Sequence, residues 1–356
     1  MSSNSAALGG PAFDPEAIRR KYQEESEKRR SAKPTAARPV AESKVPSVED
    51  PFVEPGFERE PLHDEVDVVV VGGGHTGLVT GVNLRRAGVP RVRVIEKAGG
   101  FGGVWYWNRY PGIRCDVDAY SYMPMLEEVG TMPSEKYVQG DEIRAHAQAL
   151  AEKFGLDEPA LMQTQVTGMR WDDHVDRWIV TTDRGDEIRA RFVCLGSGTL
   201  DNPSIPDVPG LDEFEGRVFH SSRWDYDYTG GNERGGLTKL AGKRVAVVGT
   251  AASAIQFIPE AAKYAEQVVV VQRTPVVVIP RNNEATDPEW YRNQPPGWQK
   301  ERVENLTTIV QTPPGSKPPA RDILNDSLTG MSKMSRNVSP QLAALLWRAP
   351  TLPRGC

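Results

Sequence analysis

The sequence has little cysteine, no long apolar run and no excess of positive charge, and each shortage excludes a class of protein. Its 356 residues contain three cysteines, too few and too scattered for a disulfide framework or a metal cage. No apolar stretch approaches the length of a membrane span, and residues 1–11 lack the core of a signal peptide. The net charge of −5 gives no reason to expect nucleic acid or an anionic membrane as a partner. We therefore expect a cytoplasmic protein without a membrane span; the sequence indicates no protein partner.

The composition is that of a folded protein with room for two domains. Hydrophobic residues make up 38% and charged residues 26% of the chain, and 356 residues are enough for two cores. Asp14 and Pro15 predict the start of a charged helix that runs to about Arg30, because Asp caps a helix and Pro suits its first position. Residues 31–56 are rich in Pro, Ala and Ser and predict a linker.

The strongest motif is the glycine-rich sequence from Gly72 to Gly77, directly after the apolar run Val66–Val71. The run predicts a buried parallel strand, and the residues after the glycines predict a helix. In such a turn Gly72 allows the tight bend, Gly74 lets the backbone approach a pyrophosphate, and Gly77 lets helix and strand pack closely. The free N–H groups of the helix then bind the phosphates. The alternative is a glycine-rich turn that binds no ligand.

The acid that follows this motif indicates which dinucleotide it would bind. Glu96 ends a second predicted strand, 92–96, and is placed to accept hydrogen bonds from ribose hydroxyls. A carboxylate there disfavours a 2′-phosphate. The motif therefore predicts FAD or NAD rather than NADP.

A second, weaker fingerprint runs from Gly249 to Ala254, after a predicted strand at 244–248. Ala251 replaces the glycine that admits the pyrophosphate, and Ala254 replaces the packing glycine. The next predicted strand ends in Gln272-Arg273-Thr274, with a cation and a hydroxyl where the first site has an acid. These residues suit a 2′-phosphate and predict NADPH. The alternative is a Rossmann-like half that holds no ligand well.

Between the fingerprints lies a segment, 102–116, with three consecutive large aromatic residues among glycines. It has neither helical nor strand periodicity, so it does not resemble a core segment. Its aromatic rings could form a flat wall for a flavin, with Arg114 and Asp116 as the polar groups beside it. An aromatic surface loop is the alternative. Two dinucleotide sites in one chain imply that electrons pass from one cofactor to the other.

Two longer patterns resemble the signatures of the flavin-dependent Baeyer–Villiger monooxygenases. The first is F-x-G-x-x-x-H-x-x-x-W followed by P or D, and it is matched by Phe214, Gly216, His220, Trp224 and Asp225. The second is G-G-x-W-x-x-x-x-Y-P-G-x-x-x-D, and it is matched by Gly102, Gly103, Trp105, Tyr110, Pro111, Gly112 and Asp116. The resemblance covers roughly residues 50–287.

The resemblance implies a role for each site residue. FAD would be bound by Gly72, Gly74, Gly77, Glu96, Val104, Trp105, Tyr106, Trp107, Asp116, Tyr122 and the backbone near Val166. NADPH would be bound by Gly249, Thr250, Ala251, Ala252, Ser253, Ala254, Ile255, Arg273 and Thr274. Arg114, Cys115 and Asp116 would lie beside the cofactors, with Arg114 and Asp116 as the catalytic residues between flavin and nicotinamide. His220 would belong to the linker between the nucleotide domains and would not act as a base.

The implied fold is α/β with two Rossmann-like dinucleotide-binding domains, the NADPH domain inserted into the FAD domain. We expect a polar helix and linker at 1–56, the FAD domain at 57–205, the NADPH domain at 206–290 and a divergent segment at 291–356. The chain departs from the family in its last part. The family's catalytic arginine stands in a K-R context, and residues 274–356 contain none; Arg321 has different surroundings. We therefore expect a shortened form with an incomplete FAD domain and an exposed apolar sheet edge.

Three functions remain open from the sequence. The first is an FAD- and NADPH-dependent monooxygenase that uses O₂ to convert a ketone into an ester or lactone, in natural-product or steroid-like metabolism. The second is a flavoprotein that oxidises NADPH without coupling, or that oxygenates a heteroatom. The third is a non-catalytic chain that binds FAD at most. Because the arginine context is absent, we expect these 356 residues to lose most electrons from NADPH to H₂O₂.

Overall fold

The computed structural model describes residues 15–31, 37–39, 50–200, 202–206, 208–272, 278, 280–313, 319–330 and 332. The chain divides into two compact units. The smaller unit consists of the described parts of Met1–Val48 and Pro203–Val218, and the larger of those of Glu49–Asn202 and Phe219–Cys356.

The smaller unit contains a long charged helix and a short two-stranded sheet. Its elements are α1 (Pro15–Ser31), β1 (Ala37–Pro39), β7 (Ser204–Pro206) and the 3-10 helix η2 (Leu211–Glu213). The helix predicted from Asp14 and Pro15 is confirmed. The predicted linker, however, contains β1, which pairs antiparallel with β7. Local sequence does not reveal this strand, because its hydrogen-bond partners are about 170 residues away, at 204–206.

The main sheet of the larger unit follows the order β3-β2-β6-β5-β4. Its strands are β2 (His63–Val71), β3 (Val92–Ile95), β4 (Val166–Asp172), β5 (Arg177–Thr182) and β6 (Glu187–Leu195). β2 is parallel to both β3 and β6, while β5 is antiparallel to β4 and β6. The apolar run Val66–Val71 forms the predicted parallel strand, and Val69 and Val70 are fully buried.

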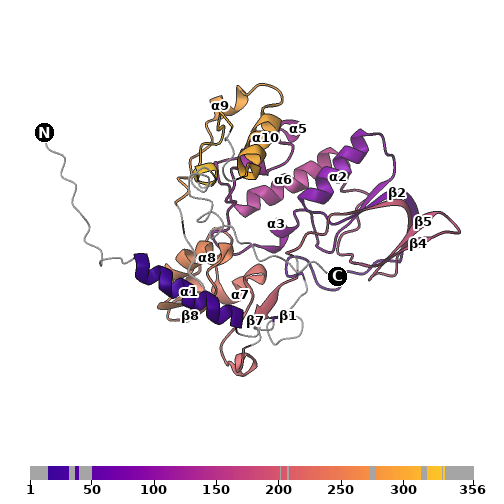
Figure 1. Cartoon of the computed structure of the whole chain (residues 1–356). Helices are drawn as coiled ribbons and strands as arrows, with labels where there is room; N and C mark the ends of the chain where they lie inside the picture. The colour runs from indigo at the N-terminus through magenta and orange to yellow at the C-terminus, as the bar shows by residue number, and fades with distance from the viewer. Residues whose placement is uncertain are drawn as a thin grey trace. The chain divides into compact units, whose positions relative to one another are not determined.

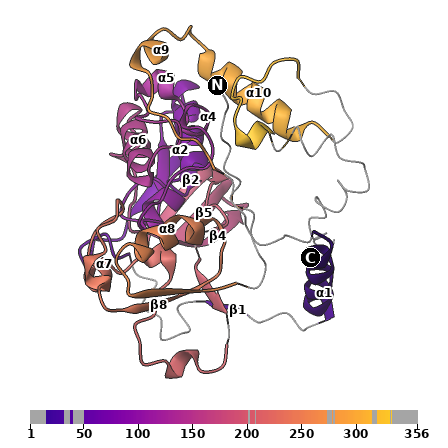
Figure 2. The ribbon, with the colours of Figure 1, turned by 90° about the vertical axis from the view of Figure 1, so that its left-hand side faces the viewer.

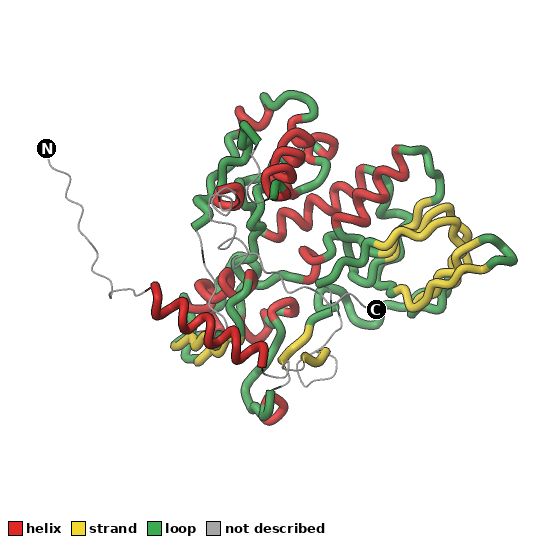
Figure 3. The backbone as a smooth tube through the Cα atoms, viewed as in Figure 1, coloured by secondary structure: helices red, strands yellow, loops and turns green. Residues whose placement is uncertain are grey.

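Two long helices pack beside the parallel part of this sheet. α2 (His75–Arg86) and α6 (Gly140–Lys153) lie side by side in Figure 1. Leu78 and Val82 of α2 and Leu150 of α6 are fully buried in one cluster with Val70 of β2. This apolar cluster fixes the N-terminus of α2 at the carboxyl edge of β2. In Figure 3 the strands of this sheet gather on one side, and α2 follows β2 through the glycine turn.

Short helices connect the sheet to a second strand–helix–strand unit. They are α3 (Val104–Trp107), α4 (Ala119–Tyr122), α5 (Leu126–Val129), η3 (Ser221–Arg223), α7 (Tyr226–Thr229) and η4 (Thr238–Leu240). The second unit consists of β8 (Arg244–Val248), α8 (Ala252–Ala262) and β9 (Gln267–Val271). Figure 2 labels β8 and α8 near α7. β8 and β9 are parallel, as the second fingerprint predicts.

Both sheets present apolar side chains to solvent. On β6, Phe192 is 60% and Leu195 65% exposed. The residues of β6 after Ala190 pair with β2 but no longer with β5. On β8, Val248 is 71% exposed. β6 lies between β2 and β5 in the sheet order, so its exposed side chains stand on an inner strand, and the apolar edge expected from the sequence stays a prediction.

The remaining helices, α9 (Pro288–Arg292) and α10 (Trp298–Gln311), pack onto the segment around α4. Arg302 of α10 donates three hydrogen bonds to the carboxylate of Asp118, the N-cap of α4, at 2.8–3.2 Å, and both side chains are almost fully buried. The Gln299 amide donates to the carbonyl of Met123 and accepts from Leu126 N–H. No helix in the described part of the chain combines the length and apolar character needed to cross a bilayer.

Candidate functional site

The glycine turn after β2 closes against the loop that follows β6. Gly72 has φ +105°, and a Cβ on it would lie 2.5 Å from the carbonyl oxygen of Gly196. A Cβ on Gly77 would lie 1.9 Å from the carbonyl oxygen of Gly72. Gly74 is different: its φ is −78° and a Cβ would meet only Gly103, at 3.4 Å. The first two glycines are therefore required by the fold, and the third leaves bare backbone at the N-terminus of α2.

A cavity of about 360 Å³ opens at this N-terminus. It lies at the carboxyl edge of the parallel strands, where open α/β sheets bind their ligands. The residues of the predicted FAD site that line it are Gly72, Gly74, Glu96, Val104, Trp105, Trp107, Tyr122 and Val166. One cavity thus brings together residues from the first fingerprint, the second strand and the aromatic segment.

Glu96 has a double role in this cavity. Its side chain lines the wall, yet it is only 6% exposed. One carboxylate oxygen accepts a hydrogen bond from Gly73 N–H at 2.5 Å and the other from Ala98 N–H at 2.8 Å. The carboxylate therefore holds the glycine turn in place.

The aromatic segment forms an apolar wall of the cavity. A Cβ on Gly103 would lie 2.8 Å from Gly74 Cα, so the glycines bring this wall against the phosphate-binding turn. Trp105 Nε1 donates to the Tyr122 hydroxyl at 2.9 Å, and the two rings meet edge to face. Trp107 carries the Arg223 guanidinium 4.0 Å from its ring centroid. These contacts hold two of the three predicted aromatic rings at the cavity.

Tyr106 is the aromatic residue that the structure does not place in the cavity wall. Its hydroxyl donates to Asp50 at 2.7 Å and its ring packs edge to face on Phe52. Burial and this hydrogen bond raise the pKa of Tyr106. Consecutive residues of a helical turn point about 100° apart, so three neighbours in α3 cannot all face one ligand.

The sequence interpretation missed several cavity residues, His75 first among them. It occupies a position at which the fingerprint allows any residue, and its ring centroid lies 5.2 Å from that of Tyr122. Burial lowers the pKa of His75 to about 4, so the imidazole is neutral at pH 7 and adds no charge to the site. The loop Gly196-Ser197-Gly198 also lines the cavity. A glycine pair directly after an apolar strand was the available signal for this loop.

Arg114, Cys115 and Asp116 do not line the cavity. The Arg114 guanidinium pairs with Glu135 and donates to the Tyr137 carbonyl. Cys115 is buried, and burial raises its thiol pKa to about 12. The Asp116 side chain is 70% exposed and lies 3.9 Å from Arg281. The predicted catalytic pair therefore lies outside the lining of the first cavity, on the segment that continues from its aromatic wall.

The second fingerprint forms the turn between β8 and α8. Gly249 has φ +106°, its N–H donates to Val271 at 2.8 Å, and a Cβ there would contact nothing within 4 Å. Ala251 and Ala252 are exposed at the start of α8, whereas Ala254 is buried. Thr250, Ser253 and Ile255 complete the turn and first helical residues. Arg273 and Thr274 lie outside the described residues.

The described signature residues have structural roles. His220 Nδ1 accepts from Ser222 N–H, and burial lowers the pKa of the ring. Trp224 is buried and donates to Thr229 at 3.0 Å. Asp225 caps α7 through the N–H of Tyr228.

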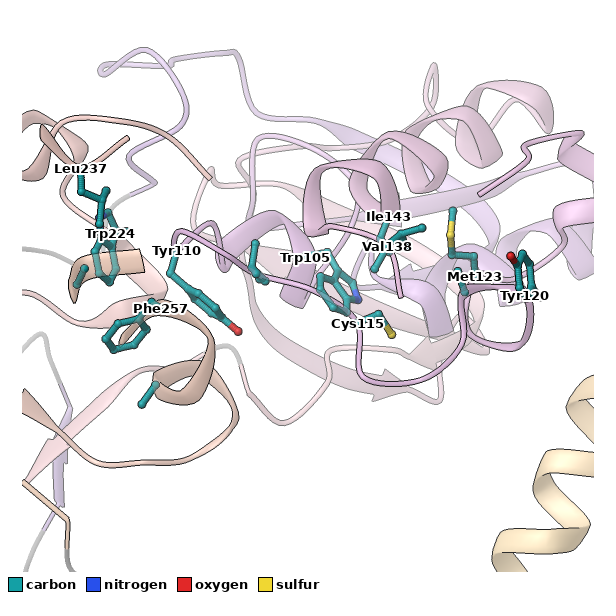
Figure 4. Close-up of a cluster of buried hydrophobic side chains, with 14 of the residues drawn as sticks. Trp105, Tyr110, Cys115, Tyr120, Met123, Val138, Ile143, Trp224, Leu237 and Phe257 are labelled. Atoms are coloured by element: carbon teal, nitrogen blue, oxygen red, sulfur yellow. The ribbon is translucent and has the colours of Figure 1, made fainter. Parts of the chain in front are cut away.

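The buried side chains around the signature continue into the aromatic segment. In Figure 4 they extend from Tyr120 and Met123 at one side to Trp224 and Leu237 at the other, with Trp105 and Tyr110 between them. One apolar cluster thus joins the wall of the cavity to helix α8. A mixed sheet whose parallel strands end at a glycine-turn cavity, together with a second strand–helix–strand unit, defines an α/β protein with two dinucleotide-binding folds.

Comparison with known proteins identifies the family. Residues 69–291 match the family described as pyridine nucleotide-disulphide oxidoreductase. The chain is 48% identical to Baeyer–Villiger monooxygenase 4 of Dietzia sp. strain D5, covering 84% of this chain and 49% of that protein. It therefore belongs to the Baeyer–Villiger monooxygenase family within these oxidoreductases.

Solved structures agree with this membership. The polycyclic ketone monooxygenase from Thermothelomyces thermophila superimposes with a TM-score of 0.81 at 36% identity, covering 90% of this chain and 54% of that one. A structure of OTEMO in complex with FAD and NADP superimposes with a TM-score of 0.60 at 32% identity, covering 71% and 46%. The chain spans about half the length of the curated relatives it matches.

Proposed function

We propose that this protein is an FAD- and NADPH-dependent monooxygenase that inserts an oxygen atom from O₂ beside the carbonyl of a ketone, giving an ester or a lactone. The observation that carries the proposal is the cavity at the N-terminus of α2, with a bare glycine turn at one end and an aromatic wall at the other. Relatives named as Baeyer–Villiger and polycyclic ketone monooxygenases support the reaction type and a natural-product ketone as substrate.

The residues of the cavity fit FAD. Gly74 and the first N–H groups of α2 would bind the diphosphate, because no side chain covers them and the helix dipole favours an anion. Glu96 would accept from the ribose hydroxyls while keeping its bonds to the turn. Trp105 and Trp107 would border the flavin ring. When bound, FAD supplies the hydride-accepting and oxygen-activating chemistry that no side chain has.

The exposed turn of the second fingerprint would bind NADPH. Ala251 and Ala252 leave the N-terminus of α8 accessible, and Arg273 and Thr274 would read the 2′-phosphate. Arg114 and Asp116 would act on the side of the flavin where the carbonyl of the ketone reacts. Both residues stand on the segment that follows the aromatic wall of the cavity. Asp116 would orient a cation, and the Arg281 guanidinium lies 3.9 Å from its carboxylate. The guanidinium groups of Arg114 and Arg281 would stabilise negative charge that develops in the reaction.

The domain boundaries belong to the same proposal: an FAD domain at 57–205 and an NADPH domain at 206–290, flanked by 1–56 and 291–356. The two β–α–β units at 63–95 and 244–271 support them. We also propose a cytoplasmic location, because Cys115 and Cys194 are both free thiols.

Purification followed by an absorbance spectrum tests the proposal. A flavin spectrum that bleaches with NADPH under anaerobic conditions is expected. Incubation with a polycyclic ketone and, separately, a thioether then distinguishes the reaction types. Ester or lactone from the ketone supports the proposal. Only sulfoxide, or H₂O₂ without organic product, would support the heteroatom-oxygenating or uncoupled flavoprotein instead, and a colourless protein that does not take up added FAD would refute all of these.

A further inference from the structure

Helix α8 holds the segment that carries Arg114 and Asp116 through one side chain, Gln256. Its Oε1 accepts from Arg114 N–H at 3.3 Å and its Nε2 donates to the Arg114 carbonyl at 3.0 Å. The side-chain amide thus pairs with the Arg114 backbone as a neighbouring strand would. The same Oε1 accepts from the Tyr110 hydroxyl at 3.0 Å.

The packing around Gln256 leaves the segment little freedom. The Tyr110 ring is 6% exposed and meets Phe257 of α8 edge to face. Gly112 has φ +79°, and a Cβ on it would lie 2.9 Å from the Gln256 carbonyl oxygen. On the opposite side, Arg114 forms an antiparallel bridge with Gln139. The segment is therefore enclosed between α8 and residues 138–140, and a shift of α8 must move it or break these bonds.

The position of Gln256 relates the two candidate sites. It lies one helical turn after Ala252, the first residue of α8, where the second dinucleotide would bind. The segment that it holds begins just after Trp107, which lines the first cavity. Gln256 thus links the first turns of α8, by hydrogen bonds to Tyr110 and to the Arg114 backbone, to the segment that follows the wall of the first cavity.

We propose that Gln256 is a positioning residue that couples the second dinucleotide site to the first, by fixing the Arg114 backbone to α8. The inference rests on the proposed function, because it requires both cofactors. A ligand that orders the N-terminus of α8 would then change the affinity of the first cavity, and by linkage the reverse.

The test is the effect of NADP⁺ on FAD affinity, measured on the full chain by flavin fluorescence with and without saturating NADP⁺. Coupling between two sites typically changes affinity about 5- to 150-fold. Gln256→Met keeps the side-chain length and removes all three hydrogen bonds. We therefore expect it to reduce the coupling factor, which is the ratio of FAD affinities with and without NADP⁺, by roughly 2- to 12-fold or more. Tyr110→Phe removes a single bond and should reduce it less. The NADP⁺-induced change in the flavin absorbance spectrum should shrink in the same order.

Gln148→Met is the matched control, because that glutamine is also helical but its amide reaches only Glu152, on an exposed face of α6. It should leave the factor unchanged. If the role of Gln256 were purely structural, its replacement would lower Tm and would weaken FAD binding equally with and without NADP⁺. A coupling factor that is unchanged in both Gln256→Met and Tyr110→Phe therefore overturns the inference. If Gln256→Met does not fold, Tyr110→Phe decides by the same criterion. A wild-type chain that does not bind FAD would refute the proposed function and this inference together, whereas a failure confined to the variants refutes the inference alone.

Discussion

Replacing Gly74 by Ala separates the cofactor site from the fold more sharply than any other substitution in the glycine turn. The added Cβ would meet Gly103 Cα at 3.4 Å, an ordinary contact, and φ of −78° suits any residue. Gly→Ala at a compatible position changes stability by only about 0.4–1 kcal/mol, in the stabilising direction. The folded structure should therefore persist, with Tm close to that of the wild type.

The same methyl group should impair FAD binding, because it stands where backbone N–H groups would meet the diphosphate. Overpacking a close contact costs about 1–3 kcal/mol. That cost corresponds to FAD binding roughly 5- to 150-fold weaker. Titration of the apoprotein with FAD, followed by flavin fluorescence, measures it, and circular dichroism checks the fold.

Gly77→Ala is the contrasting variant. Its Cβ would lie 1.9 Å from the Gly72 carbonyl oxygen, which is backbone and cannot move aside as a side chain can. We expect this variant to lose stability as well as FAD. Wild-type FAD affinity in Gly74→Ala, or normal Tm in Gly77→Ala, would refute the reasoning from the glycine turn.

Three further predictions follow from other contacts. Arg302→Ala strands a buried carboxylate and should reduce the free energy of unfolding by about 3–5 kcal/mol, against about 0.2–1 kcal/mol for Arg321→Ala in an exposed pair, both measured by urea titration; equal losses would contradict this. The Arg59 guanidinium holds the pKa of Asp186 below its usual range, so the stabilisation is present above about pH 4 and is lost as the pH falls further; Asp186→Asn should weaken the acid dependence of Tm, and an unchanged dependence would count against it. Arg273→Ala should slow flavin reduction by NADPH far more than by NADH in stopped-flow measurements, since only NADPH has a 2′-phosphate; equal slowing would mean that Arg273 does not read the phosphate.

Much of the fold could be predicted from local pattern. A continuous apolar run followed at once by glycines predicted β2, the turn and α2, because a buried parallel strand and a left-handed φ each require particular residue types. The same logic found β8, α8 and β9 even though two of the three fingerprint glycines are alanine. β1 was not predicted, because three residues carry too little pattern and its partner strand lies far along the chain.

The candidate site was predictable in part. Strand ends and glycine turns converge by geometry, so the sequence alone predicts that Gly72, Gly74 and Glu96 share one cavity. The direction of each side chain could not be predicted from the sequence. Tyr106 stands between two cavity residues in the sequence, yet its hydroxyl bonds to Asp50. Asp116 matches the signature but points to solvent.

The sequence by itself determined that this chain has two dinucleotide folds and carries the signatures of its family, because these features reside in short runs whose backbone geometry only certain residues allow. The tertiary structure alone decided which side chains meet. The Gly196 carbonyl that makes Gly72 obligatory and the Gln256 amide that holds Arg114 are each more than 100 residues away from their partners. Such contacts depend on the path of the whole chain, which no local pattern encodes.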